Sequence, residues 1–373
     1  MSFGVGVIGA TGFIGTPYRE EIRRCGDAAR IVALCARRRD LLEAAGREDG
    51  AELLTDDWRQ VVEHPDVNLV IVATPDVLHH EEAMACAAAG KHIFCEKPVG
   101  LNVGEAADIW SAYRDSGRAH FVPFWTRYLA SFARAREIVR SGTLGDIRSI
   151  VYRWHNPRPE SMPFTWRDDA AVSSAGSIAD VGSHGYDTLR WITGLEATRV
   201  LTHADVISPA KPHLGEVNLS EAIAWGESHP AEDAPETRRG TAYDYASIAF
   251  EADNGAVGTV VLSHAPFLRK WLSPELELHG TKASLAVNRL SGELSLARGL
   301  DEAEVIDTLP HPGWGNRFGD YVFPAMKAAI AGDATDHPDL EDGYRVQLFT
   351  DAAALSARDG RWVALKSIDP ATK

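Results

Sequence analysis

A charged tripeptide, Glu96-Lys97-Pro98, directly follows the short apolar run Lys91–Cys95, which is typical of a buried strand. Pro98 would end the strand pairing and set the direction of the chain. An ammonium group at such a point can hydrogen-bond a substrate hydroxyl and stabilise a developing alkoxide. Taken alone, Lys97 is better explained as a solvated loop lysine, so its importance depends on what surrounds it.

A second pair with chemical potential is Asp180 and His184, in the sequence GSIADVGSH. Residues four apart on a helix share a face, so the two side chains can meet. An imidazole beside a carboxylate is a plausible general base at neutral pH. The alternative is a helix N-cap aspartate followed by an unrelated histidine, and spacing alone does not separate the two.

Three glycines, Gly9, Gly12 and Gly15, lie between the first apolar run and the first helix-like segment. Glycines there allow backbone N–H groups to approach a pyrophosphate at a helix N-terminus, where the helix dipole favours an anion. Their GxxGxxG spacing is one residue longer than the usual GxGxxG, and an ordinary tight turn is the alternative. We expect the cofactor contacts of this turn from Gly9, Thr11, Gly12, Phe13 and Ile14.

The second apolar run ends in Ala36-Arg37-Arg38-Arg39. NAD-binding chains usually carry Asp or Glu at this point for the ribose 2′-hydroxyl, whereas NADP-binding chains supply arginine for the 2′-phosphate. An arginine run at a helix N-terminus is unfavourable unless an anion compensates it. The pattern therefore favours NADP over NAD, with Arg37 and Arg38 as phosphate ligands, and a solvated helix start is the alternative.

These candidates are spaced along a regular alternation of strand-like and helix-like segments from residue 3 to about 123. Such alternation predicts parallel strands joined by right-handed crossovers, and hence a doubly wound α/β sheet. The predicted strands are Phe3–Gly9, Arg30–Ala36, Asn68–Ala73, Lys91–Cys95 and Ala119–Phe124. Ligands of an open α/β sheet bind outside the carboxyl ends of the strands. We therefore expect the cofactor crevice to be lined by Thr74, Pro75, His79, Glu96 and Lys97.

After residue 124 the pattern changes to that of a second, α+β domain, so the expected domains are 1–123 and 124–373. Consecutive strand-like runs joined by short glycine-containing turns predict a largely antiparallel sheet. Residues 207–240 are rich in Pro, Glu and Gly without a clear period, and we interpret them as a long loop or lid. Helices are predicted at Tyr128–Ser141, Asp180–Thr193 and Leu340–Asp359.

The composition of the 373-residue chain excludes several classes of protein. Its net charge of −15 offers no extended basic face for nucleic acid, and no apolar run approaches the roughly 20 residues of a membrane-spanning helix. The four cysteines form no CxxC pair, which predicts a reducing compartment and no structural metal. The chain begins without a basic leader. We therefore expect a cytoplasmic protein with a small-molecule substrate.

Taken together, the motifs GATGFIG, ATPDVLH, CEKPV and GSIADVGSHGYD resemble, in order and spacing, those of the glucose-fructose oxidoreductase, inositol dehydrogenase and rhizopine-catabolism (Gfo/Idh/MocA) family. The resemblance extends to NGAVGTV, HGTKASLAV and LEDGYRVQ, and so covers almost the whole chain. It implies a dinucleotide-binding Rossmann domain and a second domain whose open sheet often makes a subunit interface. It also implies reversible oxidation of a secondary alcohol on a sugar or polyol with NADP or NAD, by a homodimer or homotetramer.

Carried over to this chain, the resemblance implies that Lys97 is the catalytic lysine, His184 the acid/base histidine and Asp180 the aspartate that assists it. His184 would accept the hydroxyl proton while Lys97 stabilises the oxygen, and the cofactor would carry the hydride chemistry. The indole of Trp125 stands where many relatives have Asn or Gln, so it could stack on a sugar face or pack in the crevice. The candidate substrate contacts are Trp125, Arg127, Trp166 and Arg167.

Two other functions are compatible with the same residues. A glycosidase of the same fold would oxidise its substrate transiently at C3, eliminate the aglycone and recycle a tightly held NAD, and the arginines after the second strand weigh mildly against it. A regulatory binder that has lost catalysis would not need Lys97, Asp180 and His184 together. The leading interpretation is a dehydrogenase of a sugar, sugar derivative or cyclic polyol that prefers NADP.

Overall fold

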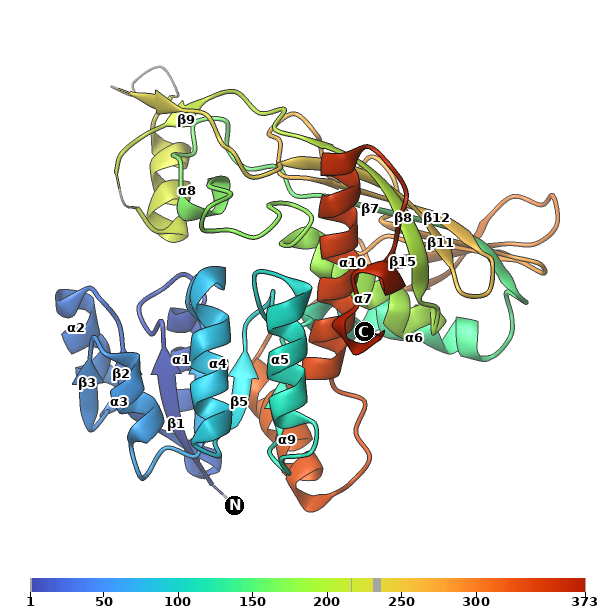
Figure 1. Ribbon diagram of the computed structural model, residues 1–373. Helices are drawn as coiled ribbons and strands as arrows, with labels where there is room; N and C mark the ends of the chain where they lie inside the picture. Colours follow the sequence, from blue (N-terminus) through green and yellow to red (C-terminus); the bar gives the residue numbers. More distant parts are fainter. Residues whose placement is uncertain (1, 216, 231–235, 373) are drawn as a thin grey trace. The chain divides into compact units, whose positions relative to one another are not determined.

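The computed structural model describes residues 2–215, 217–230 and 236–372, which group into two compact units (Figure 1). Unit 1 comprises Met1–Pro123, Asn218–Ser220 and Trp314–Tyr344, and unit 2 comprises Phe124–Val217, Glu221–Gly313 and Arg345–Lys373. The units divide at residue 123, where the sequence places a domain boundary. Residues 218–220 and 314–344 differ from the expectation, because they group with the first unit and not with the second.

Unit 1 is built on a six-stranded parallel sheet of order β3-β2-β1-β4-β5-β6. Every residue of β1, β4 and β5 is buried, because helices cover both faces of a doubly wound sheet. Strands β1 and β4 are neighbours at the centre of the sheet, and the direction in which strands are added reverses between them. This is the topological switch point. The strands are β1 (Phe3–Ile8), β2 (Ala29–Cys35), β3 (Leu53–Thr55), β4 (Leu69–Val72), β5 (His92–Cys95) and β6 (His120–Phe121).

The crossover helices of unit 1 begin and end at residues suited to helix termini. Asp57 accepts a hydrogen bond from the backbone N–H of Arg59, and Asn102 accepts one from that of Glu105. Gly50 ends the second helix in the left-handed conformation. The helices are α1 (Gly15–Arg23), α2 (Arg39–Asp49), α3 (Trp58–Glu63), α4 (His79–Ala88) and α5 (Val103–Tyr113).

Residues 314–344 complete the core of unit 1 with aromatic side chains. Helix α9 (Phe323–Ala331) follows a π-helical turn, η6 (Phe318–Val322), and neither element is predicted from the sequence. The ring of Phe323 stacks on Phe3 with centroids 5.2 Å apart, and the ring of Phe318 meets Tyr18 edge-on, also at 5.2 Å. These contacts explain why the segment belongs to unit 1.

Unit 2 contains a nine-stranded sheet of order β16-β15-β14-β13-β7-β12-β11-β8-β17. Its neighbouring strands are antiparallel except for β7 and β12, which run parallel and place His155 beside Ser263. The expectation of a largely antiparallel sheet is confirmed with this exception. The strands are β7 (Ile147–His155), β8 (Ala197–Asp205), β11 (Tyr245–Ala252), β12 (Val257–Ser263), β13 (Leu276–Gly280), β14 (Ser284–Val287), β15 (Glu293–Ala297), β16 (Glu304–Thr308) and β17 (Val363–Ala364).

Helix α7 (Val181–Thr193) packs closely on the sheet of unit 2 through two glycines. A Cβ atom on Gly182 would lie 2.7 Å from the side chain of Leu262, and one on Gly185 would lie 3.0 Å from the ring of Tyr152. The first turns of α7 are thereby brought against β7 and β12. Two further helices have bounds within two residues of the prediction, α6 (Ala130–Arg140) and α10 (Leu340–Asp359).

The segment 207–240 is more ordered than the loop or lid that the sequence suggests. It contains helix α8 (Leu219–Ser228) and a two-stranded antiparallel ladder of β9 (Lys211–Pro212) with β10 (Thr237–Arg238). Residues 216 and 231–235 of this segment lie outside the described residues. Within the described chain, no helix combines the length and apolar character needed to cross a membrane. In the same residues, no cluster of three or more His, Cys, Asp or Glu side chains could hold a metal ion.

Candidate active site

The glycine turn after β1 lies at the switch point of the unit 1 sheet and leads into α1. Gly9 has a φ of +85°, and a Cβ atom there would lie 2.4 Å from the carbonyl oxygen of Ala73. A Cβ atom on Gly15 would lie 2.2 Å from the carbonyl oxygen of Gly9. The bare backbone therefore forms a cradle at the N-terminus of α1, which fits the pyrophosphate of a dinucleotide. Thr11, Gly12, Phe13 and Ile14, the other residues expected to contact the cofactor, all belong to this turn.

His79 ties together the two loops that follow β4 and β5. Its ring is buried, with Nδ1 2.6 Å from the carbonyl oxygen of Pro98 and Nε2 2.9 Å from that of Thr74. Both ring nitrogens are thus engaged by backbone carbonyls. His79 thereby holds Thr74-Pro75 against the Lys97-Pro98 turn, and its contact with the cofactor stays a prediction.

Glu96 fixes the start of the same turn. The hydroxyl of Tyr18 donates to its Oε1 at 2.5 Å, and the backbone N–H of Lys97 donates to its Oε2 at 3.1 Å. Glu96 is buried, whereas Lys97 is half-buried. Both carboxylate oxygens of Glu96 therefore bind the protein itself, so we assign it the task of orienting the turn that carries Lys97. The sequence offered no signal for Tyr18, which reads as an ordinary core residue of a helix.

A buried carboxyl group lies behind Thr74. The Thr74 hydroxyl donates to Oε2 of Glu82 at 2.6 Å, and Glu82 is fully buried on α4. Burial raises the pKa of Glu82 to about 7, although the Thr74 hydrogen bond acts in the opposite direction. Glu82 is a second group that sequence reasoning missed, because an acidic residue within an alanine-rich helix gives no sign of which way it faces.

The arginines after β2 differ in the contacts that their side chains make. Arg39 forms an ion pair with Glu43 one helical turn later, at 2.9 Å. Arg37 is exposed, and among the described residues it has no hydrogen bond or ion pair. Ala36, at the tip of the strand, is buried and offers no acceptor for a ribose hydroxyl. An anion at this tip would therefore meet the free guanidinium of Arg37.

In unit 2, α7 carries both members of the predicted acid/base pair. Asp180 is the N-cap residue of α7, and His184 follows one turn later. The imidazole of His184 lies among aromatic rings, with its centroid 5.7 Å from that of Trp154 and 6.0 Å from that of Phe124. These rings limit the orientations that the imidazole can take.

Asp180 is contacted by two residues that the sequence analysis did not identify. Its Oδ2 lies 3.1 Å from Nε2 of His264 and 3.3 Å from Nη2 of Arg158. Burial, together with the charge of Arg158, lowers the pKa of His264 to about 4. Burial also lowers the pKa of Arg158, against the effect of Asp180. The sequence carried no signal for this cluster, because it depends on the parallel pairing of β7 and β12, the strands whose following segments supply Arg158 and His264.

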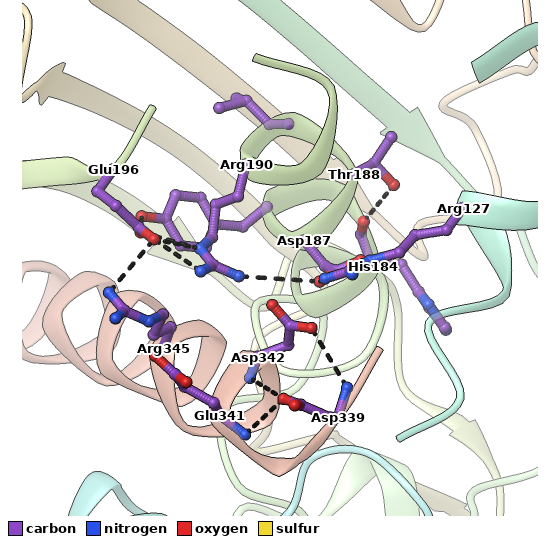
Figure 2. A network of polar contacts seen from close by, with 12 residues as sticks. Arg127, His184, Asp187, Thr188, Arg190, Glu196, Asp339, Glu341, Asp342 and Arg345 are labelled. Atoms are coloured by element: carbon purple, nitrogen blue, oxygen red, sulfur yellow. Dashed lines mark hydrogen bonds and ion pairs between the residues drawn. The ribbon is translucent and has the colours of Figure 1, made fainter. Parts of the chain in front are cut away.

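Arg127 and Trp125 lie in a short 3-10 helix, η3 (Trp125–Tyr128), that α7 holds in place. The Nε and Nη2 atoms of Arg127 bind the two carboxylate oxygens of Asp187 at 2.8 and 2.5 Å, and both side chains are buried. Figure 2 shows Asp187 and the neighbouring ion pair of Arg190 with Glu196. This favours a structural role for Arg127 over the expected substrate contact. Trp125 is buried, which favours packing of its indole.

Trp166 and Arg167 lie together in the 3-10 helix η4 (Trp166–Asp168), with the Arg167 guanidinium 4.5 Å from the centre of the Trp166 ring. Both side chains are half-buried. The ladder of β9 and β10 anchors this helix through two ion pairs. They join Lys211 to Asp168 at 2.5 Å and Arg238 to Asp169 at 2.6 Å.

Comparison with protein families places both parts of the chain. Residues 3–124 match the model of the oxidoreductase family with an NAD-binding Rossmann fold, and residues 132–286 match that of the GFO/IDH/MocA C-terminal domain. The chain belongs to the Gfo/Idh/MocA family of oxidoreductases. The resemblance noted in the sequence and the predicted α/β fold are both confirmed.

Several proteins that resemble the chain are named sugar or inositol dehydrogenases. Levoglucosan dehydrogenase of Pseudarthrobacter phenanthrenivorans is 29% identical over 354 residues, which is 88% of each chain. Myo-inositol 2-dehydrogenase of Thermotoga maritima is 30% identical over 203 residues, or 54% of this chain and 58% of the relative. The structure of levoglucosan dehydrogenase in complex with NADH aligns with a TM-score of 0.81 at 25% identity, over 98% of this chain and 99% of the other.

Proposed function

We propose that the protein is an NAD(P)-dependent dehydrogenase that oxidises a secondary alcohol of a sugar, sugar derivative or cyclic polyol. The observation that carries the proposal is the edge of the unit 1 sheet, where the glycine cradle, Thr74-Pro75 and the Glu96-Lys97-Pro98 turn follow strands β1, β4 and β5. His79 joins the last two of these segments. The catalytic lysine candidate thus belongs to the same sheet edge that fits a dinucleotide.

The residues of the chain have separate tasks in this reaction. The cradle from Gly9 to Ile14 would hold the pyrophosphate, and Thr74 and Pro75 would line the path toward the nicotinamide. The nicotinamide ring, when bound, supplies the hydride acceptor. Lys97 donates a hydrogen bond to the reacting oxygen and stabilises its developing negative charge. His184 accepts the hydroxyl proton, and Asp180 assists it.

NADP is the preferred cofactor in this proposal. Support comes from Ala36, which leaves the tip of β2 without a carboxylate, and from the uncommitted guanidinium of Arg37. Arg38, the N-cap residue of α2, is the second candidate ligand of a 2′-phosphate. The levoglucosan dehydrogenase complexes contain NADH, so NAD is the alternative to be measured against it.

The substrate class is proposed from the relatives and from one segment of unit 2. The names of the relatives cover an anhydrosugar, levoglucosan, and inositols. Trp166 and Arg167 combine an aromatic face with a guanidinium, which suits the apolar face and the hydroxyl groups of a pyranose or cyclitol. The β9–β10 ladder holds these two residues in place.

The test is reduction of NADP and NAD, followed by absorbance, across levoglucosan, inositols, aldoses and their derivatives. Turnover with members of one class, and a higher kcat/KM with NADP, is expected. A protein that binds the nucleotide yet reduces none of it with any alcohol would contradict the proposal. Release of aglycone from aryl glycosides without net reduction would instead identify the glycosidase.

A further inference from the structure

The Asp180 carboxylate is approached by two donors that come from distant parts of the chain. His264 directly follows β12, and Arg158 lies three residues after the end of β7. Because β7 and β12 are parallel neighbours, both segments leave the sheet at the same edge. The N-cap of α7 lies at this edge, and its Asp180 places Oδ2 within 3.1 Å of His264 Nε2 and 3.3 Å of Arg158 Nη2.

Backbone hydrogen bonds link the segments that carry Arg158 and His264. The N–H of Arg158 donates to the carbonyl oxygen of His264 at 3.3 Å. The N–H of His264 donates to the carbonyl oxygen of Asp244 at 2.8 Å. The two segments that carry these side chains are therefore tied to each other and to the segment of Asp244.

The groups around Asp180 differ in charge. His264 is influenced by Arg158, Asp180 and Lys211, and the low pKa that burial imposes keeps its imidazole neutral above pH 5. Arg158 is influenced by Asp180, Asp168, Asp244 and Arg167. The carboxylate of Asp244 receives the N–H groups of Ile207 and Ser208, at 2.8 and 3.0 Å, and the carboxylate of Asp168 binds Lys211. Arg158 thus brings a cation directly to Asp180, at 3.3 Å.

We propose that His264 and Arg158 are positioning residues for the acid/base pair: Arg158 donates a hydrogen bond to the Asp180 carboxylate, and His264 turns its Nε2–H toward the same oxygen at 3.1 Å, without the alignment of a full hydrogen bond. The inference rests on the proposed function, because it concerns how Asp180 serves His184 in that reaction. A neutral imidazole has one N–H, and only the Nε2–H tautomer directs it at the carboxylate. Asp180 is thereby kept as an acceptor at one position on the first turn of α7.

The tautomer can be measured without any substrate. Histidine 15N chemical shifts of the holoprotein distinguish Nδ1–H from Nε2–H rings, and comparison with His264→Leu assigns the His264 signals. His92 provides an internal reference, because its Nδ1 accepts the N–H of Ala119 at 2.9 Å and its proton is therefore on Nε2. The expected result is the Nε2–H form for His264. A predominant Nδ1–H form would overturn the proposal, whether or not the enzyme turns over sugars.

The kinetic test compares three substitutions over a range of pH. His264→Leu removes the donor, His264→Gln keeps an N–H donor, and His155→Leu changes a histidine at the neighbouring strand end that contacts the carbonyl oxygen of Arg269. We expect His264→Leu to lower kcat about 10- to 100-fold. The acid limb of its pH profile should move upward, because the carboxylate loses an N–H dipole that favours its charged form. His264→Gln should recover most of both effects.

The outcomes separate this inference from the function on which it rests. A wild-type protein without redox turnover contradicts the proposed function, and the tautomer measurement then decides the role of His264. Normal wild-type turnover with an unshifted acid limb in His264→Leu contradicts the inference alone. An equal shift in His155→Leu would also overturn it, because the effect would then not depend on the contact with Asp180.

Discussion

The guanidinium of Arg127 is bound by both carboxylate oxygens of Asp187, which lies on α7 three residues after His184. Both side chains are buried, so neither can be removed alone without leaving a charge that water cannot reach. This pair, with the hydrogen bond between Thr188 and Thr126 at 2.6 Å, joins η3 to the helix that carries the acid/base candidates.

Removal of Arg127 is therefore expected to act on stability. Arg127→Leu should lower the free energy of unfolding in urea by about 3 kcal/mol, since Asp187 keeps only the more distant ion pair with Arg190, at 4.0 Å. The double variant Arg127→Leu/Asp187→Leu should recover much of the loss. If Arg127→Leu raised KM for the sugar at unchanged stability, the direct substrate contact suggested by the sequence would be restored.

Lys97→Ala should separate catalysis from folding. The half-buried ammonium group stabilises charge on the reacting oxygen, so kcat should fall about 100- to 1,000-fold while the melting temperature is unchanged. Lys91→Ala is the matched control, because the Lys91 ammonium donates to the carbonyl oxygens of His64 and Val67 at 3.0 and 2.7 Å. The control should lose stability and keep kcat. Near-native turnover in Lys97→Ala would refute its catalytic assignment.

Glu82 predicts a dependence of stability on pH. Burial raises the pKa of Glu82 in the folded protein to about 7, from its ordinary value of 4.5, so the native protein binds more protons than the unfolded chain between these values. The contribution of this group therefore favours folding at low pH and is lost as the pH rises toward 7 and above. Glu82→Gln should gain about 2–3 kcal/mol relative to wild type between pH 5 and pH 8. Urea unfolding at the two pH values would measure it, and a constant difference would contradict the assignment.

Cofactor choice can be tested at the tip of β2. Arg37→Ala should raise KM for NADP at least about 10-fold and leave that for NAD nearly unchanged, because a charge-assisted contact to the 2′-phosphate is lost. Arg39→Ala is the matched control, since Arg39 is engaged with Glu43. Equal effects of the two substitutions on NADP and NAD would show that these arginines do not read the 2′-phosphate.

The fold of unit 1 could be predicted because its signals are local. Strands β1, β2, β4 and β5 are apolar runs, and each is followed by a segment of helical period, whereas the three-residue β3 was not predicted. Helix α9 was missed because its identity depends on aromatic contacts with Phe3 and Tyr18, which no local pattern displays. The ordered parts of 207–240 were missed because two-residue strands are too short to show alternation.

Asp180 and His184 could be predicted as candidate site residues, because their residue types and their spacing of four suit an acid/base pair on one helix. The partners of Asp180 could not be predicted, because the sequential strands of unit 2 suggested antiparallel pairing, which would send the segments after β7 and β12 to opposite edges. The parallel register of these two strands brings Arg158 and His264 together. The sequence also did not show that His79 and Glu96 bind the backbone of the neighbouring loops. A motif of this kind contains both side chains that bind a ligand and side chains that bind the backbone, and the sequence does not distinguish them.

The stacking of Phe323 on Phe3 has a consequence for biosynthesis. The first strand of unit 1 leaves the ribosome before any of its neighbours, whereas its aromatic partner follows after most of the chain has been made, roughly tens of seconds later at ordinary rates of translation. During this interval Phe3 and Tyr18 lack the Phe323 and Phe318 rings that pack against them in the finished unit. The unit that is translated first therefore completes its core only after residues 314–344 have been made. A fragment ending at residue 123 lacks part of its own interior.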